Sequence, residues 1–185
     1  MEYFKLVMVR PHLENIPVYH LPERYQFKLF EDQDEIHWAA VETAAGEFQT
    51  LTSALKHFDK EFSGHLEEMK KRCVFLLSPD GEVVGTTTAW LGEFQGISQG
   101  RLHWVAIKPS HQGRGLAKPM LSYALSIMAK YHYKAYLTTQ TTSWKAVRMY
   151  LDFGFEPARL HNGDQDYQKG WELIRQLAPD KQISY

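Results

Sequence analysis

Two glycines separate an apolar segment from a helix-like segment in the run Gln112-Gly113-Arg114-Gly115-Leu116-Ala117. Before this run, residues 101–107 are apolar on both faces, which is typical of a strand buried in a sheet. After it, apolar residues recur every four positions over 116–128, which predicts a helix. Pro119 is tolerated only in a first helical turn, so the helix should begin within a few residues of Gly115. Main-chain N–H groups and the positive end of a helix dipole would then face an anion, most naturally a phosphate.

Two familiar phosphate-binding loops do not fit this run. A nucleotide P-loop ends in Gly-Lys followed by Ser or Thr, which is absent here. A dinucleotide-binding loop needs a third small residue at the right step and an acidic residue about twenty positions further on. The glycine spacing ends at Pro119, and the downstream residues 133–136 contain no acid. A glycine-rich turn that only joins a strand to a helix is the remaining alternative.

A second motif follows in residues 143–155, which read SWKAVRMYLDFGF. Ser143 and Tyr150 are seven positions apart, so on a helix they share a face, with Ala146 between them. Gly154 stands where a helix commonly ends in a left-handed residue. The motif therefore predicts a helix with one face formed by these three residues.

The two motifs together resemble those of the GNAT N-acetyltransferase superfamily. Gln112-x-x-Gly115-x-Ala117 resembles the family's pyrophosphate-binding signature. The second motif matches the family's N-x-x-A-x-x-x-Y-x-x-x-G-F helix at four positions, which are Ala146, Tyr150, Gly154 and Phe155. Ser143 departs from the pattern, since it occupies the usual asparagine position. A serine is a good N-cap, but its side chain reaches less far toward a cofactor.

The resemblance implies an α/β fold, a mixed and largely antiparallel central sheet of about six strands with helices on both faces. It also implies transfer of an acyl group, normally acetyl, from acetyl-CoA to an amine. The pyrophosphate would lie on the N–H groups of the loop, which are those of Gln112, Gly113, Arg114, Gly115, Leu116 and Ala117. The pantetheine arm would bond the backbone at Val105 and Ile107, and Ser143 would stand beside the cofactor. Tyr150 holds the position of the acid that protonates the departing thiolate.

The general base must come from elsewhere. Many family members carry a glutamate at the position of Arg101, whose guanidinium stays protonated and cannot act as a base. Counted by twos along the strand, Arg101, His103, Val105 and Ile107 share one face, so His103 should lie on the catalytic face. His103 also resembles the strand histidines of the arylalkylamine acetyltransferases. A histidine suits the task, with an unperturbed pKa of about 6.5 that burial lowers further. The alternatives are a core histidine, or Glu93 as the base.

The composition indicates which kinds of partner and which cellular compartment to expect for the protein. A net charge of −1, from 21 basic and 22 acidic residues, argues against a general nucleic-acid or membrane surface. The single cysteine, Cys73, is expected to be buried and inert, and suits a reducing compartment. The nine histidines show no metal-binding spacing, so no metal is expected. No apolar run resembles a signal peptide or a membrane span, so we expect a soluble, cytoplasmic protein.

The expected organisation is a single acetyltransferase domain with two extensions. Residues 1–24 should form an extended arm, with a short strand allowed at Lys5–Val9, and residues 162–185 a helical extension packed on the domain of 25–161. The further strands are expected at 25–30, 72–78, 83–90, 101–107, 135–139 and 155–161. Helices are expected over 31–42, 51–69 and 116–128, after Ser143, and over 167–177, with a loop at 91–100.

These features predict an acyl-CoA-dependent N-acyltransferase that moves acetyl from acetyl-CoA to a primary amine of a small molecule by direct attack. Two alternatives stay open. One is an acetyltransferase acting on a protein or peptide amine, and the other is a non-catalytic acyl-CoA-binding module. The sequence identifies neither the acceptor nor the oligomeric state, and a homodimer stays open.

Overall fold

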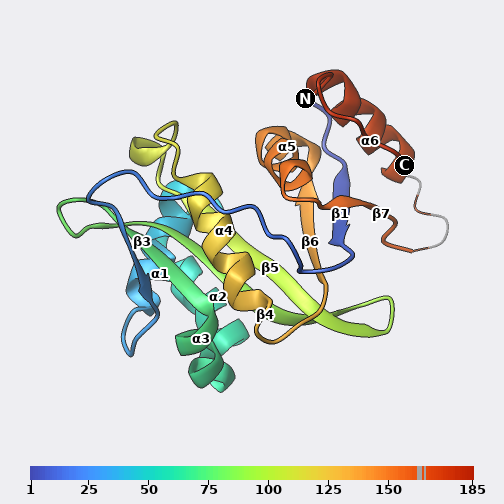
Figure 1. Cartoon of the computed structure of the whole chain (residues 1–185). Helices are drawn as coiled ribbons and strands as arrows, with labels where there is room; N and C mark the ends of the chain where they lie inside the picture. Colours follow the sequence, from blue (N-terminus) through green and yellow to red (C-terminus); the bar gives the residue numbers. More distant parts are fainter. Residues whose placement is uncertain (162–163, 165) are drawn as a thin grey trace. The chain divides into compact units, whose positions relative to one another are not determined.

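The computed structural model describes residues 1–161, 164 and 166–185. Its strands are β1 (Lys5–Arg10), β2 (Gln26–Leu29), β3 (Cys73–Leu77), β4 (Val83–Phe94), β5 (Ile97–Ile107), β6 (Ala135–Gln140) and β7 (Glu156–Ala158). Its α-helices are α1 (Glu35–Ala45), α2 (Leu51–Phe62), α3 (Leu66–Arg72), α4 (Ala117–Met128), α5 (Trp144–Asp152) and α6 (Asp166–Leu177) (Figure 1).

The strands form one sheet in the order β2-β3-β4-β5-β6-β1-β7. The pairs β2–β3, β3–β4, β1–β6 and β1–β7 are antiparallel. β5 and β6 pair in parallel, with Gly100 opposite Ala135. The predicted mixed, largely antiparallel α/β fold is confirmed. The strand allowed near the N-terminus is confirmed as β1.

The chain divides into two compact units, and β4 and β5 contribute to both. The central unit contains residues Val18–Trp90 and Leu102–Lys130. The terminal unit contains Met1–Pro17, Leu91–Arg101 and Tyr131–Tyr185. The central unit therefore carries the glycine run and the terminal unit carries the second motif.

Alternation along the strands builds two apolar layers in the central unit. Phe75 and Ala106 pack with Trp38 and other side chains of α1 and α2 on one face of the sheet. Their neighbours in sequence, such as Leu76, pack with Leu116 and Met120 of the α4 region on the other face. Helices accordingly cover both faces of this part of the sheet (Figure 1). Burying apolar side chains on both faces stabilises the strands from which the glycine run departs.

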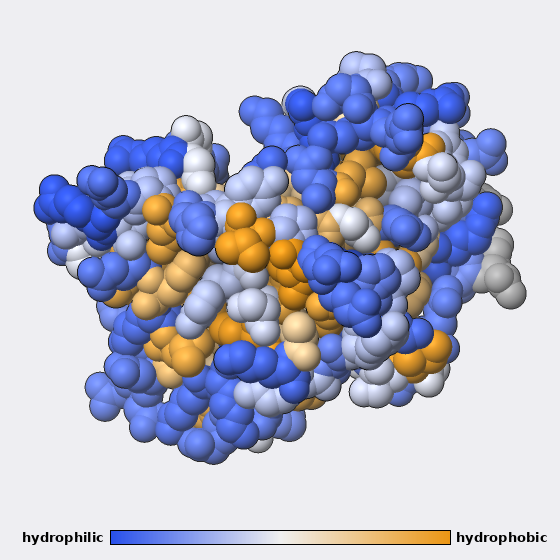
Figure 2. All heavy atoms as spheres, viewed as in Figure 1, coloured by the Kyte–Doolittle hydropathy of each residue, from blue (hydrophilic) through white to orange (hydrophobic). Residues whose placement is uncertain are grey.

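Hydrophilic side chains dominate the face shown in Figure 2, where apolar residues reach the surface only in smaller patches. Within the described ranges, no helix combines the length and the apolar character that crossing a membrane requires.

Two predicted elements need correction. The predicted loop at 91–100 is largely strand, because β4 and β5 extend to a tight turn at Gln95 and Gly96, whose φ angles are 53° and 73°. Positive φ at both central residues matches the twist of a two-residue hairpin. The predicted helix over 51–69 is interrupted by the 3-10 turn Ser63–His65. Gly64 lies in that turn, and glycine costs about 1 kcal/mol in a helix interior.

The other expected elements are present with shifted ends. α4 begins at Ala117, so Pro119 falls in its first turn, as predicted. The expected C-terminal helix is confirmed as α6. It packs on β1 so closely that a Cβ at Gly170 would lie 2.8 Å from Leu6 Cδ2. The domain boundaries at 24 and 161 stay a prediction, and residues 162, 163 and 165 lie outside the described residues.

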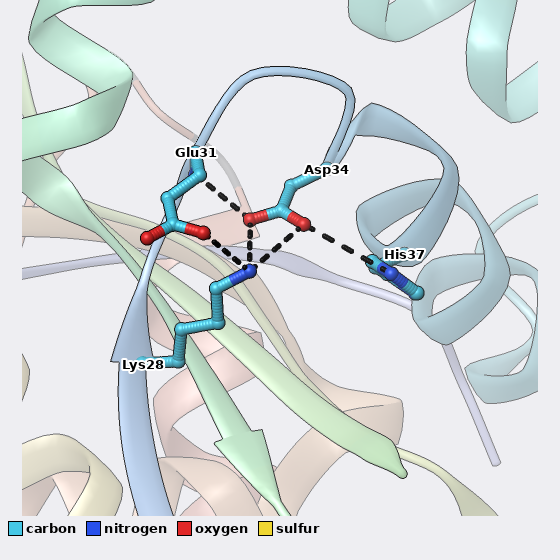
Figure 3. A network of polar contacts seen from close by, with 4 residues as sticks. All are labelled: Lys28, Glu31, Asp34 and His37. Carbon is cyan, nitrogen blue, oxygen red and sulfur yellow. Dashed lines mark hydrogen bonds and ion pairs between the residues drawn. The ribbon is translucent and has the colours of Figure 1, made fainter. Parts of the chain in front are cut away.

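A polar network joins β2 to the start of α1 (Figure 3). Lys28 Nζ lies 2.9 Å from Asp34 Oδ2 and 3.0 Å from Glu31 Oε2. Asp34 Oδ2 also accepts the Glu31 N–H at 2.8 Å, and His37 Nε2 lies 3.9 Å from Oδ1. The hydrogen bond to Asp34 is the main reason that the pKa of Lys28 is raised. These acids therefore order the turn before α1.

Glu42 is a buried acid on α1, with 1% of its surface exposed. Burial, with a smaller contribution from Glu47, raises its pKa to about 8. Its Oε1 has no hydrogen-bond partner among the described residues. The side chain is therefore protonated at neutral pH in the folded protein, because an ionised carboxylate would be desolvated and unpaired.

We expect Glu42 to make folding stability depend on pH. The unfolded chain loses this proton near pH 4.5 and the folded protein near pH 8, so stability should fall as pH rises through that window. Glu42→Gln should remove this pH dependence. At about pH 9, its free energy of unfolding should exceed that of the parent by on the order of 4 kcal/mol. Urea unfolding across pH measures the effect, with the exposed Glu23→Gln as control. Parallel pH profiles for Glu42→Gln and the parent would contradict it.

Candidate active site

The glycine run forms an exposed loop between β5 and α4. Gly113 and Gly115 both have φ of 75°, and a Cβ built on either would meet nothing within 4 Å. Leu116, the N-cap of α4, makes no side-chain capping bond, and the first turn holds no acid. The loop therefore curls through two left-handed glycines beside a helix N-terminus that no side chain caps, as anion binding requires.

Gln112 has a structural role within the loop. Its Nε2 donates to Ile107 O at 2.9 Å, and its N–H donates to Pro109 O at 3.3 Å. To bind a pyrophosphate, that N–H would have to share its hydrogen with Pro109 O or turn away from it. The role expected of Gln112 at the cofactor stays a prediction.

Two cationic side chains belong to the loop and to the helical turn that follows it. Arg114 is exposed, and its guanidinium donates to Ser110 O at 3.0 Å and lies 3.5 Å from Tyr25 Oη. Lys118, in the first turn of α4, lies over the Tyr19 ring at 5.0 Å from its centroid. One cation within an exposed glycine loop and another in the helical turn that follows it favour a multiply charged anion such as a diphosphate.

β5 is interrupted at Trp104, whose φ is 51° in the middle of the strand. A left-handed residue within a strand is typical of a β-bulge, which turns neighbouring side chains to the same side. His103 and Trp104 accordingly both bond Glu61 of α2. Val105 and Ile107 pack instead with Leu116 on the α4 side. The expectation that His103 shares a face with Val105 and Ile107 is therefore wrong, because strict alternation ends at Trp104.

Glu61 gathers three ring N–H groups on the α2 side of the sheet. Its Oε1 lies 2.6 Å from His103 Nε2. Its Oε2 lies 2.9 Å from Trp104 Nε1 and 2.9 Å from His57 Nε2. The side chains of His103 and Glu61 are 13% and 24% exposed, so the pair is partly shielded but reachable by solvent.

Two opposing effects set the ionisation of Glu61. Burial alone would raise the pKa of Glu61, but hydrogen bonds and charge from His103, together with the bonds from Trp104 and His57, lower it to about 2. The carboxylate is therefore ionised throughout the neutral range. An ionised carboxylate only accepts hydrogen bonds, so Nε2 of each histidine must carry a hydrogen.

Val105 and Ile107 lie half-buried on β5, between the bulge and the glycine loop. The Ile107 carbonyl already accepts the Gln112 side chain. Any further hydrogen bond from a pantetheine arm at this residue would have to share that carbonyl or use the N–H.

Tyr150 and Ser143 belong to the terminal unit. Tyr150 is buried on α5, with 7% of its surface exposed, and its ring meets that of Phe155 edge to face at 6.0 Å. Ser143 occupies the N-cap position of α5 but makes no capping bond, and its Oγ accepts from Gln140 Nε2 at 3.0 Å. Ser143 therefore occupies the expected N-cap position, but its side chain does not cap the helix.

Arg10 of β1 secures the end of α5. Its Nε donates to the Phe153 carbonyl at 2.7 Å, and Gly154 follows with φ of 76°. A cation and a left-handed glycine at a helix C-terminus satisfy carbonyls that the helix itself leaves unpaired. The sequence prediction for Gly154 is confirmed. Arg10 and Gly154 thus stabilise the C-terminal end of α5, the helix that carries Tyr150.

Comparison with known proteins now identifies the family. The model of the Acetyltransferase (GNAT) family matches residues 35–155, which include the glycine loop and the α5 motif. This chain belongs to the GNAT acetyltransferase family. A search of curated proteins finds no match to the sequence.

Solved GNAT structures share the fold. A GCN5-related N-acetyltransferase from Sphaerobacter thermophilus superposes with a TM-score of 0.64 at 20% identity, covering 84% of this chain and 49% of that chain. An acetyltransferase of the GNAT family from Colwellia psychrerythraea gives a TM-score of 0.65 at 11% identity, covering 85% and 55%. This chain therefore spans about half the length of these relatives, and the likeness shows the fold.

Two further candidate residues of this GNAT chain, Cys73 and Glu93, lie outside the glycine loop, the contacts of Glu61 and helix α5. Cys73 is fully buried beside Thr86, and burial raises the pKa of its thiol to about 12. A thiol reacts as the thiolate, so Cys73 is not an acyl carrier at neutral pH. Glu93, the alternative base, is exposed on β4 in the terminal unit. Within the described part of the chain, no three His, Cys, Asp or Glu side chains form a group that could hold a metal.

Sequence reasoning missed Glu61 and His57. They are four positions apart on α2, a spacing at which helical side chains meet. That spacing was a usable signal within the predicted helix. The contact of Glu61 with His103 spans 42 positions and depends on the bulge at Trp104, which no local pattern marks.

Proposed function

We propose that this protein is an acyl-CoA-dependent N-acyltransferase that transfers acetyl from acetyl-CoA to a primary amine of a small molecule. The observation that carries the proposal is the exposed loop of Gly113 and Gly115 at the uncapped start of α4, on a chain of the GNAT family. The loop would bind the pyrophosphate through N–H groups from Gly113 to Ala117. The single buried Cys73 suits a reducing compartment, which supports a cytoplasmic location.

The proposed chemistry is direct attack of the amine on the thioester. The amine nitrogen forms a bond to the acetyl carbonyl carbon, which gives a tetrahedral oxyanion. His103 accepts the proton that the amine nitrogen loses, and the carbon–sulfur bond then breaks. Tyr150 donates a proton to the departing thiolate, so the products are an N-acetyl amide and free CoA thiol. Buried Cys73 offers no competing nucleophile.

The class of acceptor that accelerates thiol release distinguishes this proposal from its alternatives. We expect primary alkylamines to accelerate thiol release from acetyl-CoA in a colorimetric assay, and lysine-containing peptides to do so less. A strong preference for peptides would select the protein-acetylating alternative. Binding of acetyl-CoA without acceleration by any amine or peptide would select the non-catalytic module.

We expect His103→Gln to lower turnover by about 10², because the attacking amine nitrogen then has no side chain to accept the proton that it loses. A histidine base works only when deprotonated, so the parent should lose activity as the pH falls through the pKa of His103. The variant should lack this acid limb while binding acetyl-CoA with parental affinity. Initial rates across pH, with calorimetry of acetyl-CoA, measure both. An unchanged rate and pH profile would mean that Glu93 or solvent, and not His103, accepts the proton of the amine.

A further inference from the structure

The carboxylate of Glu61 has no place in the mechanism above, although it contacts the proposed base. It lies 2.6 Å from His103 Nε2, on a helix far from β5 in sequence. The bulge at Trp104 is what makes this contact possible, since it turns two consecutive side chains of β5 toward α2. A left-handed conformation is unfavourable for a tryptophan within a strand, and such strain gathers at functional sites.

We propose that Glu61 is a positioning residue, which holds His103 in the tautomer whose Nε2 carries hydrogen and so presents Nδ1 as the atom that takes the amine's proton. The inference rests on the proposed function, since it assigns a partner to the proposed base. Trp104 and His57 hold the carboxylate through Oε2, which leaves Oε1 directed at His103.

The carboxylate itself is unsuited to be the base. The hydrogen bonds that lower the pKa of Glu61 and hold it ionised also make it a weak proton acceptor. A neighbouring negative charge stabilises the imidazolium that forms when His103 takes a proton. Glu61 therefore strengthens His103 as a base without accepting the proton.

Two titratable side chains of the described residues are hydrogen-bonded to Glu61. These are His103 from β5 and His57 from its own helix. The other ring neighbours of His103 and Trp104, which include Phe62 and Phe48, carry no charge. The pH dependence of His103 should therefore respond chiefly to the charge on Glu61, and less to His57, which bonds the other oxygen.

The test compares Glu61→Gln with the parent by two independent readouts. Nitrogen NMR of the His103 ring, assigned by its loss in His103→Gln, reports tautomer and pKa without any reaction. We expect the parent ring to be protonated on Nε2 when neutral, and its pKa to fall by about one pH unit or more in Glu61→Gln. Initial rates should show the acid limb moving to lower pH by the same amount, with turnover reduced about tenfold or more.

Two controls make the outcome specific. Glu68→Gln removes a different carboxylate, whose pKa is also lowered to about 2 but by Lys71 and Arg72, and should leave the rate and profile unchanged. The double variant Glu61→Gln/His103→Gln should be no slower than His103→Gln, because residues that act as a unit are not additive.

The results separate the two proposals. An unchanged His103 pKa and acid limb in Glu61→Gln, while His103→Gln abolishes the limb, would overturn the role of Glu61 and leave His103 as the base. An unchanged limb in His103→Gln would overturn the proposed base, and with it the positioning role, even if NMR confirmed the contact.

Discussion

Gly115→Glu should abolish binding of acetyl-CoA while the protein stays folded. Gly115 is exposed with φ of 75°, and the space around its Cβ position is open, so the new side chain meets no steric clash. Left-handed backbone costs a non-glycine residue about 1–2 kcal/mol, which a domain of this size tolerates. The carboxylate would project where the diphosphate is expected, and like charges without counterions repel strongly. Calorimetry with acetyl-CoA measures the loss.

Gly81→Glu is a matched control for this variant. Gly81 lies in the turn between β3 and β4, with φ of 82° and nothing within 4 Å of its Cβ position. It therefore carries the same strain and the same added charge away from the loop, and should bind acetyl-CoA as the parent does. Parental affinity in Gly115→Glu would exclude the loop as the pyrophosphate site.

Tyr150→Phe should lower turnover by about 10²–10⁴, the usual cost of losing a general acid. The substitution removes one hydroxyl and keeps the ring, which packs against Phe155 in the core of the terminal unit. Acetyl-CoA affinity and thermal stability should therefore change little. Steady-state rates with the best amine, beside calorimetry and thermal unfolding, distinguish a catalytic loss from a structural one.

Tyr136→Phe provides the comparison for Tyr150. Tyr136 has the same 7% exposure in the same unit, and stacks on Phe94 at 5.3 Å. Losing its hydroxyl should leave turnover unchanged. Equal effects of the two substitutions would mean that Tyr150 serves the core and donates no proton.

The sequence predicted the features that local patterns specify. Pro119 limited the start of α4, and Gly154 marked the end of α5, because proline and glycine have restricted roles at helix ends. The apolar spacing of residues 167–177 likewise predicted α6. These elements depend on residues within one or two turns of each other.

Features set by distant residues were not predictable in the same way. Trp104 is a poor residue for positive φ, so nothing in the sequence marks the bulge that separates His103 from Val105. Glu61 becomes visible only when the fold brings α2 to β5. Gly92, Gly96 and Gly100 suggested a loop, whereas only Gly96 forms a turn and the others lie in strands.

Product analysis tests the central claim, direct acetyl transfer to an amine, most directly. The protein is mixed with acetyl-CoA and the best primary amine, and mass spectrometry follows both the amine and the protein while thiol release is recorded. The account predicts one N-acetyl amide for each thiol released, and no acetyl group on the protein at any time. Thiol release without amide, or an acetylated protein that later transfers its acetyl group to the amine, would contradict it.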